Sequence, residues 1–127
     1  MNVALWIGAG LLAVVALTGG VSKVFVPRAR LAAAPGGQWT AGVGDGQVKA
    51  LGAVELLAAA GLVLPAVTGV APVVVPVTAA CWVLLMVGAM ATHGRRGETA
   101  FVALNLAYLV LAAFVAAGRF GPWSFTG

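Results

Sequence analysis

Four long apolar runs constrain this chain more than any other feature. They cover residues 3–21, 50–67, 70–91 and 99–117, and Glu55 is the only charged residue inside them. Each run has the length of a membrane-crossing helix, which takes about 20 apolar residues. No alternation of apolar and polar residues indicates barrel strands, and lipid admits only helices or closed barrels. The sequence therefore predicts an all-α membrane protein, a bundle of four transmembrane helices.

Composition agrees with lipid as the solvent of these helices. The chain is 62% hydrophobic and 8% charged, whereas a soluble domain carries about 25% charged residues. We expect residues 1–127 to form a single transmembrane domain. The first run is longer than the apolar core of a signal peptide, roughly 7–15 residues, and Lys23 follows this run instead of preceding it. We therefore expect the first helix to be retained.

The positive charges predict an orientation. Six of the seven lysines and arginines lie beside or within the first and third connections between the runs: Lys23, Arg28, Arg30, Lys49, Arg95 and Arg96. Connections rich in Lys and Arg stay in the cytoplasm. We expect a multi-pass protein of the bacterial inner membrane with both termini outside. Anionic lipid next to these residues accounts for the basic charge, so we expect no nucleic-acid partner.

The first connection, residues 31–47, is rich in glycine and alanine and contains one tryptophan, Trp39. Two interpretations stay open for it. It folds back over the end of the bundle with Trp39 as an anchor, or it is a flexible surface loop.

Cysteine and histidine counts exclude several chemistries. One cysteine, Cys81, cannot cycle an internal disulfide. One histidine, His93, cannot build a bis-histidine haem or a multi-histidine metal site within the chain. We therefore expect no metal site.

Glu55 is the residue that most needs an explanation. It lies about 10 Å into the second predicted helix, at 1.5 Å per residue. An acidic residue at a helix centre costs about 2.5–3.5 kcal/mol on insertion, and somewhat less at this depth. Glu55 must therefore be neutral, paired, or facing a wet cavity. Lys23 and His93 end their helices on the same side, so we expect an ionised, paired Glu55. We expect it to point into the bundle, within direct or water-bridged hydrogen-bond reach of Lys23, His93 or Asn105.

Two further polar residues lie in the same half of the membrane. Asn105 lies at about the depth of Glu55, and Tyr108 shares its helix face at a spacing of three residues. Glu55, Lys23, His93, Asn105 and Tyr108 are therefore the candidate ligand-binding or proton site.

Each candidate also has a structural interpretation. Glu55 would lock two helices by an ion pair, Lys23 would be an interfacial anchor, and His93 would be an interfacial residue. Asn105 would be an interhelical hydrogen-bonding group, and Tyr108 would only pack.

Three stretches of sequence resemble a known family. They are "SKVF" from Ser22, "LGAVELLAAAGLVLP" from Leu51 and "MVGAMATHGRRGE" from Met86. They are similar to the DoxX-like family of small bacterial four-helix membrane proteins, and the resemblance extends from Leu5 to about Phe120. It implies a four-helix bundle with a polar site facing the cytoplasm. The family name comes from a subunit of a thiosulfate:quinone oxidoreductase, and some relatives are linked to quinone or thiol redox complexes.

Three functions are compatible with these observations. The first is a quinone-associated or redox-partner subunit, with a quinone-like ligand in the polar pocket and a soluble redox partner. The second is a proton-coupled transporter of small molecules that works as a homodimer. Small multidrug transporters also have four helices and one embedded glutamate, but it lies in their first helix. The third is a non-catalytic assembly protein. A lipid-modifying enzyme using Glu55 as a base is a more distant fourth, because no residue indicates a substrate.

Overall fold

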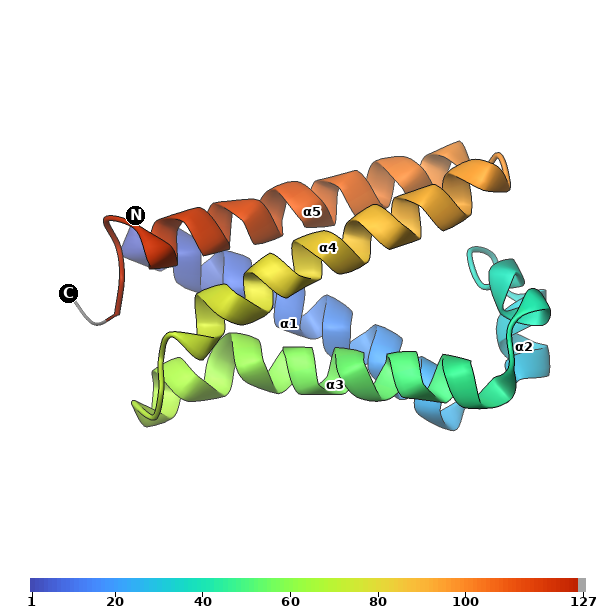
Figure 1. The fold of residues 1–127 in the computed structure, drawn as a ribbon, viewed down its shortest axis with the longest axis horizontal. Helices are drawn as coiled ribbons and strands as arrows, with labels where there is room; N and C mark the ends of the chain where they lie inside the picture. The colour runs from blue at the N-terminus through green and yellow to red at the C-terminus, as the bar shows by residue number, and fades with distance from the viewer. Residues whose placement is uncertain (126–127) are drawn as a thin grey trace.

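The structure is a computed structural model that describes residues 1–125. Within them, four helices are long and apolar enough to cross a membrane: α1 (Asn2–Phe25), α3 (Asp45–Thr68), α4 (Val74–Arg95) and α5 (Thr99–Phe120). They lie roughly side by side along the long axis of the molecule (Figure 1). The predicted fold class, an all-α bundle of four transmembrane helices, is confirmed.

The helices pack as two pairs. α1 packs mainly against α3 and α4 mainly against α5, and α3 diverges from α4 as the two helices run away from their connecting turn (Figure 1). Where the pairs meet, fully buried apolar side chains form one core, which includes Leu12, Ala16, Leu62, Ala79 and Ala112. The α3 and α4 backbones are therefore farther apart at the end opposite the α3–α4 turn (Figure 1).

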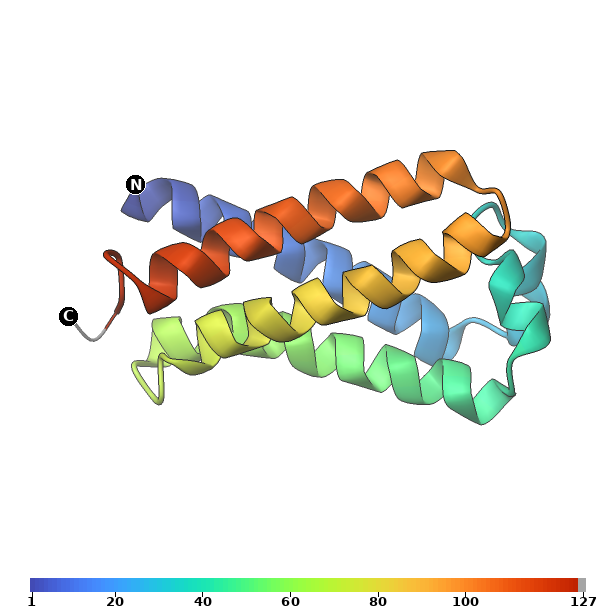
Figure 2. The same cartoon turned by 45° about the horizontal axis from the view of Figure 1, so that its top comes forward.

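That end, which we call the loop end, carries the first connection and the α4–α5 turn (Figure 2). The connection contains a short helix, α2 (Arg28–Ala33), and a 3-10 helix, η1 (Gln38–Gly42). Thr40 is buried and its hydroxyl donates to the Gly37 carbonyl at 2.7 Å, while the Arg28 guanidinium donates to the Val43 carbonyl. Of the two interpretations of this connection, the structure shows the folded one.

Two glycines set the close approach of α1 and α3. A Cβ atom added at Gly20 would lie 2.8 Å from the Gly52 carbonyl oxygen, and one added at Gly52 would lie 2.7 Å from Cβ of Lys23. Real Cβ atoms essentially never come so close, so the two backbones touch only because both residues lack a side chain. This contact brings Lys23 and Glu55 to the same level.

The helix bounds differ from the apolar runs. α1 ends at Phe25, α4 at Arg95 and α5 at Phe120, each three or four residues beyond its run, and two helix starts differ as well. α3 begins at Asp45, before the predicted residue 50, and the Gly44 backbone N–H donates to Oε1 of Gln47 at 3.2 Å, which caps this earlier start. α4 begins at Val74 and not at residue 70. Gly69 and Ala71 have φ angles of +75° and +48°, and this left-handed backbone turns the chain before α4 can start.

The opposite end, which carries both termini, is held by a buried arginine. The Arg119 guanidinium donates to Oδ1 of Asn2 at 2.7 Å and to the Trp123 carbonyl at 2.9 Å. Its central carbon also lies 3.9 Å from the ring centre of Phe125. Arg119 therefore ties the start of α1 to the segment after α5.

Candidate functional site

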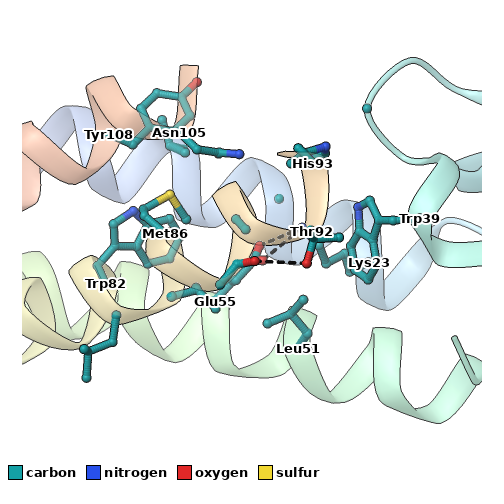
Figure 3. A pocket seen from close by; sticks show the side chains of 17 residues that line it. Lys23, Trp39, Leu51, Glu55, Trp82, Met86, Thr92, His93, Asn105 and Tyr108 are labelled. Carbon is teal, nitrogen blue, oxygen red and sulfur yellow. Dashed lines mark hydrogen bonds and ion pairs between the residues drawn. The ribbon is translucent and has the colours of Figure 1, made fainter. Parts of the chain in front are cut away.

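A cavity of about 460 Å³ lies between the two helix pairs at the loop end (Figure 3). All five candidate residues named from the sequence line it: Lys23 from α1, Glu55 from α3, His93 from α4, and Asn105 and Tyr108 from α5. The structure thus brings together residues from all four long helices around one space.

Glu55 and Lys23 form an ion pair on one wall of the cavity. Lys23 Nζ lies 2.9 Å from Oε1 and 3.1 Å from Oε2 of Glu55. The Lys23 side chain is 19% exposed and the Glu55 side chain is 8% exposed. Both carboxylate oxygens are therefore held by one ammonium in a largely dehydrated place, and Lys23 is one of the three partners that the sequence left open for Glu55.

His93 does not pair with Glu55, although the sequence made it a candidate partner. Its Nδ1 lies 2.9 Å from Oε1 of Glu98, and its ring stacks on Phe101 with centres 5.3 Å apart. The α4–α5 turn explains why His93 lies beside Glu98. Gly97 has a φ angle of +70°, and the tight turn returns Glu98 to the end of α4, where Arg96 also reaches it at 3.3 Å. The loop end thus has a second charged cluster, separate from the Lys23–Glu55 pair.

Asn105 and Tyr108 differ from these paired residues. Among residues 1–125, neither side chain makes a hydrogen bond, and both line the cavity. An amide can donate two hydrogen bonds and accept two, and a phenol can donate one. Two side chains with unused hydrogen-bonding capacity therefore line the cavity from α5.

The structure adds to the site three residues that the sequence interpretation did not assign to it, two of them tryptophans. Trp39 of η1 lines the cavity at the end near Lys23 and His93, and Trp82 and Met86 of α4 line it at the end near Tyr108 (Figure 3). For Trp82 a signal was present. It is a lone aromatic residue inside the third apolar run, whereas tryptophan in membrane proteins is enriched at the interfaces.

One side of the cavity reaches the outer surface of α4. Leu84 and Gly88 line the cavity, yet Leu84 is 72% exposed and Gly88 is exposed as well. A Cβ atom added at Gly88 would meet nothing within 4 Å. Because this surface faces lipid in a membrane-spanning helix, the cavity has an apolar opening toward the bilayer.

Four membrane-length helices around a cavity that is polar on one side and apolar on the other define a small multi-pass membrane protein with a candidate ligand site. The family model of the DoxX-like family matches residues 7–115. The chain belongs to this family. No curated protein and no solved structure matches the chain.

Proposed function

We propose that this protein is a quinone-associated subunit of the bacterial inner membrane, and that its cavity binds the quinone headgroup on the cytoplasmic side. The observation that carries the proposal is the cavity itself. It combines free polar groups on α5 with an apolar opening past Leu84 and Gly88. Its volume of about 460 Å³ falls within the usual range of small-ligand sites, about 300–1,000 Å³.

The polar groups suit the chemistry of a quinone. A quinone offers two carbonyl oxygens, which accept hydrogen bonds and donate none. The Asn105 amide and the Tyr108 hydroxyl are donors without a partner within residues 1–125. The Lys23–Glu55 pair is already satisfied, and its role in this proposal is to hold α1 and α3 in place beside the ligand.

The opening past Leu84 and Gly88 suits the apolar tail of a quinone, which would extend through it into the bilayer. Trp39 lines the cavity from η1, so the connection covers part of the aqueous end. A ligand that is dissolved in lipid would enter from the side of the bundle. The electrons that reduce the bound quinone would come from a redox partner, either a soluble protein or a second membrane chain. The single thiol of this chain cannot supply them by cycling a disulfide.

The ion pair favours ligand binding over proton-coupled transport. A transporter of that class needs a carboxylate that exchanges a proton for its substrate. Glu55 is held instead by Lys23 at 2.9 and 3.1 Å. Release of this carboxylate would leave a buried cation without its partner, at a cost of about 3–5 kcal/mol.

The test is extraction of protein purified in a mild detergent, with mass spectrometry of the extract. We expect a quinone at a near-stoichiometric level in the wild type and loss of this quinone in Asn105→Leu. Leu106→Ala is the matched control, because Leu106 is on the same helix and is exposed. A wild-type extract with no more quinone than an unrelated membrane protein from the same membranes would contradict the proposal.

A further inference from the structure

Trp82 is an unusual residue in this cavity. Its side chain belongs to the core and is 3% exposed, and it lines the cavity from α4. Within residues 1–125, its indole Nε1 is the one buried side-chain nitrogen or oxygen that has no hydrogen-bond partner. Buried polar groups are almost always satisfied, so a single exception needs a specific explanation.

The contrast with the other buried polar side chains is sharp. Thr40 donates to a backbone carbonyl, Glu55 accepts from Lys23, and His93 lies at 2.9 Å from Glu98. Arg119 donates to Asn2 and to a backbone carbonyl. Within residues 1–125, the fold therefore satisfies its buried polar side chains at both ends of the bundle, and the one buried donor that it leaves unused belongs to a residue that lines the cavity.

The chemistry of the indole specifies what would satisfy it. The Nε1–H group is a donor only, so its partner must be a hydrogen-bond acceptor. Trp82, Met86 and Tyr108 lie together at the end of the cavity away from Trp39 (Figure 3). Met86 has a flexible, polarisable side chain, so this end of the cavity can adapt its shape to a ligand.

We infer that the Trp82 indole donates a hydrogen bond to a carbonyl oxygen of the bound quinone. This inference rests on the proposed function and adds a residue that determines ligand specificity. Trp82 selects a headgroup with a carbonyl acceptor at the end of the cavity near Tyr108, over a molecule of the same shape without that acceptor.

The experiment measures binding to delipidated protein in detergent by equilibrium dialysis, with decylubiquinone as the probe. Trp82→Phe removes the donor and keeps an aromatic ring. Incorporation of 3-benzothienylalanine at position 82 also removes the donor but keeps the size and shape of the indole. Trp6→Phe is the matched control, because Trp6 contacts Phe125 and does not line the cavity.

We expect decylubiquinone to bind both position-82 variants about 3- to 10-fold more weakly than wild type, the effect of one neutral hydrogen bond. Trp6→Phe should bind as wild type does. Monoolein has an ester carbonyl on a flexible acyclic headgroup and not on a ring, so we do not expect the cavity to hold its carbonyl at Trp82. Its binding should not differ between wild type and variants. The ligand-free benzothienylalanine protein should melt at the wild-type temperature or above, since no bond within the protein is lost.

Four results would overturn the inference. Equal binding of decylubiquinone to wild type and to both variants would leave the proposed function standing and remove the role of Trp82. If the ligand-free protein with 3-benzothienylalanine at position 82 melts at a lower temperature than ligand-free wild type, Nε1 already has a partner within the protein. An equal loss of monoolein binding would assign Trp82 to lipid esters. No binding of decylubiquinone to wild type would overturn this inference together with the proposed function.

Discussion

Gly19 of α1 lies against the carboxylate of Glu55 on α3. A Cβ atom at position 19 would overlap Oε2 of Glu55 and lie 3.3 Å from Nζ of Lys23. The ion pair thus fills the space that a side chain would need, and only glycine is compatible with both partners in place.

Gly19→Ala should therefore displace the carboxylate from its position beside Lys23. Because the Glu55 carboxylate is the end of a flexible side chain, we expect a loss of about 1 kcal/mol, at the low end of the cost of overpacking. The measurement is thermal unfolding in one detergent. Gly10→Ala is the matched control on the same helix, because a Cβ atom there meets nothing within 4 Å. Equal melting of Gly19→Ala and Gly10→Ala would show that the carboxylate is not held against α1.

Glu55→Gln tests the ion pair directly. The amide cannot neutralise Lys23, and a stranded buried cation costs about 3–5 kcal/mol. The melting temperature at neutral pH should fall clearly below that of wild type. The double variant Lys23→Met with Glu55→Gln should recover much of this loss, because it removes the cation as well. A Glu55→Gln protein that melts as high as wild type would rule out a buried ion pair.

Gly36 should hold the first connection over the cavity. It has a φ angle of +79°, and a Cβ atom there would lie 2.6 Å from the Phe101 ring. A non-glycine residue in the left-handed region costs about 1–2 kcal/mol, so Gly36→Ala should raise the population of the open connection about 5- to 30-fold. Trypsin cleavage after Arg30 should accelerate accordingly.

Gly42→Ala provides the control for this experiment, since a Cβ atom at Gly42 meets nothing within 4 Å and its φ is ordinary. If both alanine variants are cleaved at the wild-type rate, the contact between Gly36 and Phe101 does not hold the connection.

The orientation can be tested with single cysteines in a Cys81→Ala background. Arg95→Cys lies at the loop end and Pro122→Cys at the terminal end, and both positions are exposed. An impermeant maleimide applied to intact cells, with the outer membrane permeabilised, should label position 122 and leave position 95 unlabelled. The reverse pattern would place the cavity on the periplasmic side.

The four transmembrane helices and the approximate depth of Glu55 can be predicted from the sequence, because the length of an apolar run and the position of a charge within it depend on local composition alone. The need of Glu55 for a partner is of this kind, and so is the side of the membrane on which its candidate partners lie. The identity of that partner, Lys23, is not, because it depends on how closely α1 and α3 approach. The partner of His93 is not, because it depends on the geometry of the turn at Gly97.

Trp82 and Gly19 show a further limit of the sequence. Their roles depend on which helix faces lie opposite each other, and a single sequence does not specify the pairing of α1 with α3. The packing of Gly20 against Gly52 fixes that pairing, and it involves residues far apart in the chain.

The ion pair has a consequence for how the protein is made. Lys23 and Glu55 are separated by 32 positions, and α1 precedes α3 in the chain. Synthesis runs from the N-terminus, so the cation that neutralises Glu55 is already present when α3 leaves the ribosome. Transfer of a carboxylate into lipid is unfavourable on an isolated helix. Glu55 can instead pair with Lys23, which lies at the same depth on a helix made earlier. The helix that carries the cation is thus synthesised before the helix whose carboxylate needs it.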